Sequence, residues 1–125
     1  RALQASVNTA NVRYFDGLGE YIDYKYVPDD LSHSSVSKTL EYAYNDWCIA
    51  QMAKQVGNTS TEEKFMKRSE YYNNVYDPKI GYMRPKLSDG NFRKNFDPMD
   101  THGQGFIEGN AWNYMCHKIL IKWLI

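Results

Sequence analysis

The longest helical pattern in the chain runs from Ser37 to Val56 and contains no Gly or Pro. Apolar side chains recur in it at steps of three and four, the spacing of one helix face. They are Leu40, Ala43, Tyr44, Trp47, Cys48, Met52 and Val56. Tyr42, Ile49 and Ala53 widen this face. The pattern therefore predicts a core helix packed against several neighbours, and Gly57 supplies a left-handed stop.

A second helix is predicted directly after this stop. Ser60 and Glu63 have the spacing of a capping box. The expected buried face consists of Phe65, Ser69, Tyr72 and Tyr76. The helix should end before Asp77-Pro78, because the residue before a proline avoids helical angles. The short connection predicts an antiparallel helical hairpin.

The sequence before the hairpin is less regular. Residues 1–14 have weak helical spacing, and residues 15–30 fit either a short helix from Leu18 or an extended segment. Ser32 to Ser35 offers N-cap candidates for the core helix.

A long irregular loop is predicted after the hairpin, between Asp77 and Gly105. Its helix breakers are Pro78, Gly81, Pro85, Gly90, Pro98, Gly103 and Gly105. Loops of this length inside a domain are usually functional. A small hairpin is plausible around Ser88–Asn91, and a last helix is expected from Phe106 or Ile107. The predicted fold class is all-α.

Composition narrows the function classes. The 125 residues fit one domain, and 15 basic residues balance 15 acidic ones, which gives no electrostatic case for nucleic acid or an anionic membrane. No apolar run is long enough to span a bilayer, and no signal peptide is recognised. Two Cys and three scattered His form no disulfide framework or metal motif, so no metal site is expected in this chain. Eleven Tyr, five Phe and three Trp suit stacking on sugar rings, although filling a helical core is the commoner use.

Glu108 is the principal candidate for chemistry. It follows a Gly-rich loop, and we expect it at the start of the last helix, surrounded by Phe106, Asn110 and Trp112. Desolvation by aromatic neighbours would hold a proton on this carboxyl group, as in the acid of a glycosidase, whereas a helix N-terminus would favour its ionised form. The alternative is an ordinary carboxylate in the first turn of a helix.

Two further charged residues have open interpretations. Arg84 lies between helix breakers, where it can present a rigid fork to an oxygen-rich ligand or form a loop salt bridge. Asp46, on the core helix, can approach a cavity, but a solvated or paired carboxylate is commoner.

Four stretches together resemble one family. SVSKTLEYAYNDWCIAQMAK, RSEYYNNVYDPKIGYMRPK, NFDP and EGNAWNY are similar in order and spacing to glycoside hydrolase family 92, the calcium-dependent exo-acting α-mannosidases common in gut Bacteroidetes. The resemblance covers about residues 12 to 114 of a single partial catalytic-domain segment, 1–125. Asn45 departs from it, since the family usually has Asp at this position.

The resemblance implies an (α/α)6 toroid whose helical hairpins include the one predicted here. It implies an inverting hydrolase of the α-1,2 type acting on mannose-containing glycans, with Glu108 as general acid. Arg84, Asn110 and Trp112 are then candidate substrate-binding residues. The family's general base and calcium ligands are expected outside this chain, so the chain alone should bind no calcium and be inactive. The full-length family is secreted, periplasmic or on the cell surface.

The tail from Met115 to Ile125 does not resemble the family. Family members continue with an aromatic residue, Val-Pro, a polar residue and Asp. One choice of codons for this tail, read one base earlier, encodes Tyr-Val-Pro-Gln-Asp. The hypothesis is that the reading frame changes just after Tyr114.

A second class of function stays open. A helical scaffold with many aromatic side chains also suits a non-catalytic module that binds carbohydrate or another protein. The intact EGNAW motif favours the enzyme lineage. If the chain is a slice of a toroid, we expect it to self-associate in isolation, because such a slice exposes helix faces.

Overall fold

The computed structural model describes residues 1–116, and about half of them are helical. The helices are α1 (Ala2–Thr9), α2 (Leu18–Tyr24), α3 (Ser35–Gln55), α4 (Thr59–Ser69) and the 3₁₀ helix η1 (Glu70–Val75). Two short strands follow, β1 (Tyr76–Asp77) and β2 (Tyr82–Met83). Residues 111–116 are helical as well. This agrees with a mainly helical fold with few strands. Most of the divergent tail, residues 117–125, lies outside the described residues.

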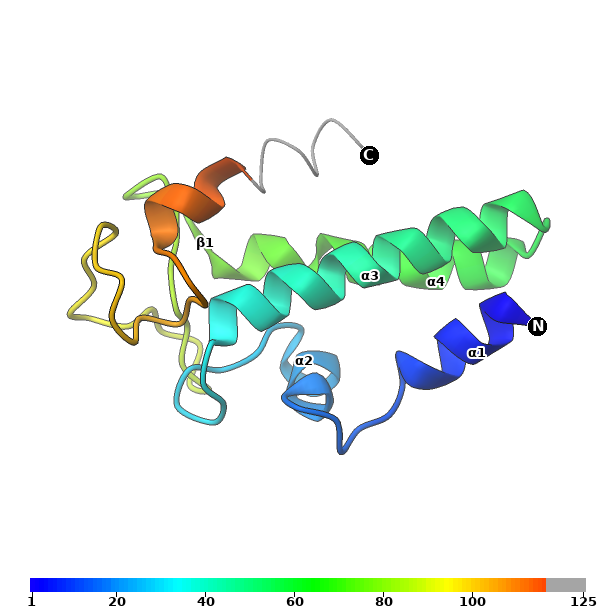
Figure 1. Ribbon diagram of the computed structural model, residues 1–125, viewed down its shortest axis with the longest axis horizontal. Helices are drawn as coiled ribbons and strands as arrows, with labels where there is room; N and C mark the ends of the chain where they lie inside the picture. Colours follow the sequence, from blue (N-terminus) through cyan, green and yellow to red (C-terminus); the bar gives the residue numbers. More distant parts are fainter. Residues whose placement is uncertain (117–125) are drawn as a thin grey trace.

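The predicted hairpin is confirmed. Helices α3 and α4 run side by side along the long axis of the molecule (Figure 1). Gly57 follows the C-terminal end of α3. Its φ is 71°, the left-handed conformation that glycine adopts without a Cβ penalty. Residues 18–24, for which two interpretations were open, form helix α2.

The buried face of α3 agrees in part with the predicted face. Its buried side chains in this stretch include Leu40, Ala43, Asp46, Ile49, Ala50 and Ala53. Tyr44 is instead 42% exposed and Val56 67% exposed, and Tyr44 stacks on Trp47 with ring centroids 6.0 Å apart. The prediction is confirmed for Leu40, Ala43, Ile49 and Ala53. It was wrong for Tyr44 and Val56, because it ranked positions by hydrophobicity. Small residues on one face allow close packing, and a polar Asp46 is accepted there because it has partners.

The start of α4 also corrects a prediction. The N-cap is Asn58, whose side chain accepts a hydrogen bond from the Thr61 amide at 3.1 Å. Ser60 lies inside the helix, so the capping box of Ser60 and Glu63 is not formed. Asn is as good an N-cap as Ser. Because the helix is capped by Asn58, it begins earlier than predicted.

The stretch between η1 and the last helix contains more pairing than predicted. β1 and β2 form an antiparallel pair in which Tyr76 faces Met83, and this hairpin was missed because each strand has two residues. A bridge between Lys86 and Phe92 confirms the small hairpin around Ser88–Asn91. The last helix begins at residue 111, later than predicted.

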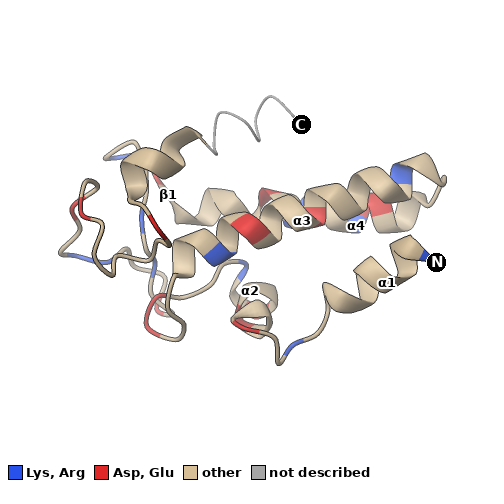
Figure 2. Cartoon of the chain, in the orientation of Figure 1, with Lys and Arg blue, Asp and Glu red and all other residues tan. Residues whose placement is uncertain are grey.

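Two features of the whole molecule bear on function. Lys, Arg, Asp and Glu are interspersed along the chain (Figure 2), in keeping with its zero net charge. Within residues 1–116, no helix has the length and apolar character that crossing a membrane requires.

Candidate active site

The residues around Glu108 belong to one loop, residues 97–110, which we call the Glu108 loop. The loop folds on itself through short polar contacts. Gln104 Nε2 donates to Asp100 Oδ2 at 2.7 Å, and the Asp97 amide donates to Gln104 Oε1 at 3.1 Å. Asn110 Nδ2 closes the loop by donating to the Met99 carbonyl at 2.8 Å. The loop is therefore ordered by its own side chains without regular secondary structure.

The Glu108 loop is attached to the N-terminus of α3. The Gly105 carbonyl accepts hydrogen bonds from the amides of Val36 and Ser37 at 2.9 and 3.2 Å. Ser34, the N-cap residue, makes no side-chain cap. The loop backbone thus satisfies first-turn amides of α3 that would otherwise lack a partner.

Glycine is required at the point of attachment. Gly105 has a φ of 83°, and a Cβ there would lie 2.8 Å from Pro85 Cγ and 2.9 Å from Ser35 Oγ. Any side chain would push the loop away from the helix. The position of Glu108 therefore depends on a glycine three residues earlier.

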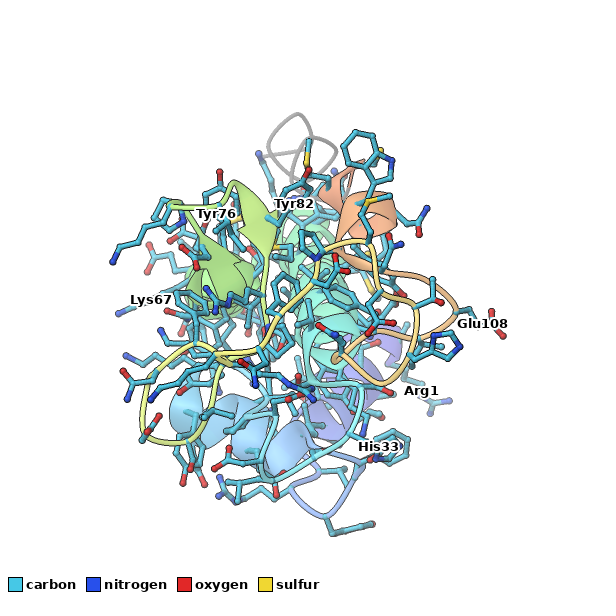
Figure 3. All side chains as sticks on the ribbon, turned by 90° about the vertical axis from the view of Figure 1, so that its left-hand side faces the viewer. Arg1, His33, Lys67, Tyr76, Tyr82 and Glu108 are labelled. Atoms are coloured by element: carbon cyan, nitrogen blue, oxygen red, sulfur yellow. The ribbon has the colours of Figure 1, made fainter. Side chains whose placement is uncertain are left out.

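Glu108 itself is exposed, and its backbone φ is 51°. Its side chain points away from the body of the molecule (Figure 3). We expected a carboxyl group enclosed by aromatic residues at the start of a helix, and neither holds among the described residues. The reason is that the loop contacts α3 through its backbone, so the side chain faces outward, and the helix begins only at residue 111.

Arg84 is held by protein acceptors. Its Nη1 lies 2.9 Å from Asp77 Oδ2, and its Nε and Nη2 donate to the carbonyls of Arg93 and Lys94 at 2.9 and 3.1 Å. The guanidinium also lies over the ring of Phe96, 5.6 Å from its centroid. Of the two open interpretations, this geometry corresponds to a salt bridge that organises the loop.

Asn110 and Trp112 differ in availability. The Asn110 side chain accepts from the Asn113 amide at 3.1 Å in addition to its bond to Met99, so it is engaged in the loop. Trp112 is 55% exposed, with its ring centroid 6.3 Å from that of Tyr82. Trp112 therefore offers an exposed aromatic ring four residues after Glu108, beside the half-buried Tyr82.

A polar depression of about 330 Å³ lies beside the loop, lined by Asp29, His33, Ser34, Arg93, Gly103, Gly105 and Phe106. Asp29 Oδ2 pairs with Arg93 Nη1 at 3.1 Å, and Asp29 Oδ1 accepts from Ser35 Oγ at 2.7 Å. In an open depression, a carboxylate can accept hydrogen bonds from hydroxyl groups and a guanidinium can donate hydrogen bonds to them. No pattern in the sequence links Asp29 to Arg93, because the two residues are 64 positions apart.

A larger cavity, about 400 Å³, lies between α1 and α3 and is mostly apolar. Its wall includes Asp46 and Arg68, whose Oδ2 and Nε are 3.0 Å apart, and the half-buried Cys48. Tyr21 donates to the same Asp46 oxygen at 2.9 Å. Burial raises the pKa of Asp46 to about 6, against the opposing effects of Arg68 and Tyr21. The charges of this cluster are satisfied internally, so it offers less for chemistry than the Glu108 loop.

The described residues do not fit a calcium site on their own. Residues 1–116 contain no group of three or more His, Cys, Asp or Glu side chains placed to hold a metal ion. No step of the chemistry discussed below is therefore assigned to calcium.

The family model described as "Glycosyl hydrolase family 92 catalytic domain" matches residues 1–119. The chain belongs to this family. The resemblance seen in the four motifs is thereby confirmed.

Solved structures of the same family are similar to the chain. The GH92 α-mannosidase BT3965 from Bacteroides thetaiotaomicron has 40% sequence identity and a TM-score of 0.88 over 93% of this chain and 16% of that one. The inverting GH92 mannosidase BT2199 from B. thetaiotaomicron VPI-5482 has 34% identity and a TM-score of 0.84, over 90% of this chain and 16% of that one. A curated relative from Arthroderma benhamiae, described as an uncharacterized secreted glycosidase, is 30% identical over 73% of this chain and 10% of its own length. The chain thus spans about a sixth or less of these relatives.

Proposed function

We propose that this chain is a segment of the catalytic domain of an inverting, exo-acting α-mannosidase, and that Glu108 is its general acid. The observation that carries the proposal is the carboxylate of an intact EGNAW motif, presented outward on a loop that is fixed to α3. Membership of glycoside hydrolase family 92 supports the reaction class. The α-1,2 linkage is the finer part of the proposal and rests on the family resemblance alone.

In the proposed reaction, Glu108 gives its proton to the glycosidic oxygen as the bond to the anomeric carbon breaks. A water molecule attacks the opposite face of the sugar and loses its proton to a second carboxylate. That base lies in another part of the family's catalytic domain. The outward direction of Glu108 suits such a shared site, because partners from other segments and the substrate can enclose its carboxyl group.

The remaining candidates take different roles in this proposal. The exposed ring of Trp112, beside Tyr82, is a surface on which a sugar can stack. Arg84 and Asn110 support the site without contacting the sugar, because their hydrogen bonds hold the loops that carry Glu108 and Trp112. The α3–α4 hairpin would be one hairpin of an (α/α)6 toroid.

The deciding experiment is Glu108→Gln in the full-length enzyme. Gln keeps the shape of the side chain but cannot donate the proton, so turnover of an α-linked mannobiose should fall by about 10²- to 10⁴-fold with substrate binding retained. The loss should be much smaller for an aryl mannoside with an activated leaving group, which needs no proton. Equal turnover of variant and parent on the disaccharide would refute the assignment.

The isolated chain tests the partial nature of the site. We expect residues 1–125 to release no mannose, with or without added calcium, since one acid cannot complete an inverting displacement. The chain should also self-associate through exposed apolar side chains such as Phe15, Val56 and Met99, which are each more than half exposed. Light scattering and sugar release measure the two outcomes. Mannose binding by the isolated chain without calcium would instead favour a non-catalytic carbohydrate-binding module.

A further inference from the structure

Glu108 has an unusual way of being held in place. The described residues give its carboxylate no hydrogen bond and no ion pair. It is also one of three non-glycine residues in the described part of the chain with positive φ. A residue other than glycine keeps a left-handed backbone conformation only where the surrounding structure holds that backbone in place. The direction of the carboxylate must therefore be set by what holds the main chain next to it.

Two side-chain hydroxyls hold the residue directly before Glu108. The Ile107 amide donates to Ser37 Oγ at 2.9 Å, and Tyr114 Oη donates to the Ile107 carbonyl at 2.9 Å. Ser37 lies in the first turn of α3 and is 2% exposed, whereas Tyr114 comes from the last helix. The amide and the carbonyl of Ile107 are thus held by two side chains, Ser37 and Tyr114, that are 77 positions apart in the sequence.

Peptide geometry passes this constraint to Glu108. The Ile107 carbonyl and the Glu108 amide belong to the same planar peptide unit. Fixing that carbonyl fixes the plane from which the Glu108 Cα extends. The Gly105 carbonyl, bonded to the amides of Val36 and Ser37, prevents the loop from sliding along α3.

We infer that Ser37 and Tyr114 are positioning residues for the general acid: they clamp the Ile107 backbone so that the Glu108 carboxyl group points to the leaving-group oxygen. This inference rests on the proposed function of Glu108. It predicts an effect on proton donation rather than on sugar binding, because neither hydroxyl is directed to the substrate.

The test removes each hydroxyl alone, as Ser37→Ala and Tyr114→Phe, in the full-length enzyme. A misplaced catalytic group costs up to about 10²-fold, so we expect kcat on an α-linked mannobiose to fall about 10- to 100-fold for each variant, with KM unchanged. On an activated aryl mannoside the fall should be less than about 3-fold, since that leaving group needs little protonation. Hydrogen exchange of the Ile107 amide should also accelerate in Ser37→Ala.

Matched controls delete a Ser and a Tyr hydroxyl at exposed positions instead. Ser60→Ala lies on α4 and Tyr24→Phe at the end of α2, and both should retain parental kcat on both substrates. Glu108→Gln is measured in the same assay. If Glu108→Gln keeps full activity on mannobiose, the acid assignment fails and the inference fails with it.

If Glu108→Gln is impaired, the clamp is judged separately. Variants of Ser37 and Tyr114 that behave like the controls, or that lose kcat equally on both substrates, would overturn the positioning role while the acid role stands. Because the two substitutions alter different helices, failure of one variant to fold leaves the other to decide.

Discussion

The two carboxylates of Asp46 and Glu108 occupy opposite environments. Asp46 is 1% exposed and is bonded to Arg68 and Tyr21. Glu108 is exposed, and among the described residues it is positioned through hydrogen bonds of the neighbouring Ile107 backbone. Of the two interpretations that the sequence left open for Glu108, enclosure by aromatic residues is not observed. A buried carboxylate with its partners in the same chain stabilises the fold, whereas an exposed carboxylate on a constrained backbone stays accessible to other molecules.

Truncation of the two side chains should give the largest contrast. Asp46→Ala leaves Arg68 buried at 7% exposure without its counter-charge, and we expect the free energy of unfolding to fall by about 3–5 kcal/mol. Glu108→Ala removes an exposed group that has no partner within residues 1–116, and it should change the free energy of unfolding by less than about 0.5 kcal/mol. Urea unfolding of both variants measures this difference, and similar losses would show that Glu108 has a structural role.

The pH dependence of stability sharpens the comparison further. Burial raises the pKa of Asp46 to about 6, against about 3.9 in an unfolded chain. The folded state therefore binds this proton more tightly, so the stabilising contribution is complete below about pH 4 and is lost as the pH rises through about 6. The loss amounts to about 3 kcal/mol.

Asp46→Asn isolates this contribution, because the amide has the same shape but does not titrate. Urea unfolding at pH 4, 5, 6 and 7 should show that the parent loses about 3 kcal/mol relative to the variant over this interval. A difference between parent and variant that stays constant across the series would contradict the raised pKa of Asp46.

Glu108→Gly should give the smallest effect, and in the opposite direction. Glycine adopts the observed φ of 51° without strain, so this variant should be more stable than Glu108→Ala by about 1 kcal/mol while lacking the carboxyl group. Thermal unfolding of the two variants side by side measures the gain. A less stable glycine variant would mean that the left-handed backbone at Glu108 is not strained.

Local patterns in the sequence were sufficient for the α3–α4 hairpin and for the glycine at its turn. An uninterrupted helical pattern, a short connection and Gly57 each act within a few residues, and each agrees with the structure. The EGNAW motif singled out Glu108 for the same reason, since its recognition needs only neighbouring residues. Family membership then followed from motifs in a fixed order.

The environment of each functional group depended on contacts between distant residues. Asp46 faces inward because Arg68, 22 positions away, and Tyr21, 25 positions away, supply its partners. Glu108 faces outward because Gly105 and Ile107 bond to the first turn of α3, with Ser37 and Ile107 separated by 70 positions. The spacing of hydrophobic residues specifies where a helix forms. The hydrogen-bonding partners of a polar side chain are determined only when the helices and loops pack together.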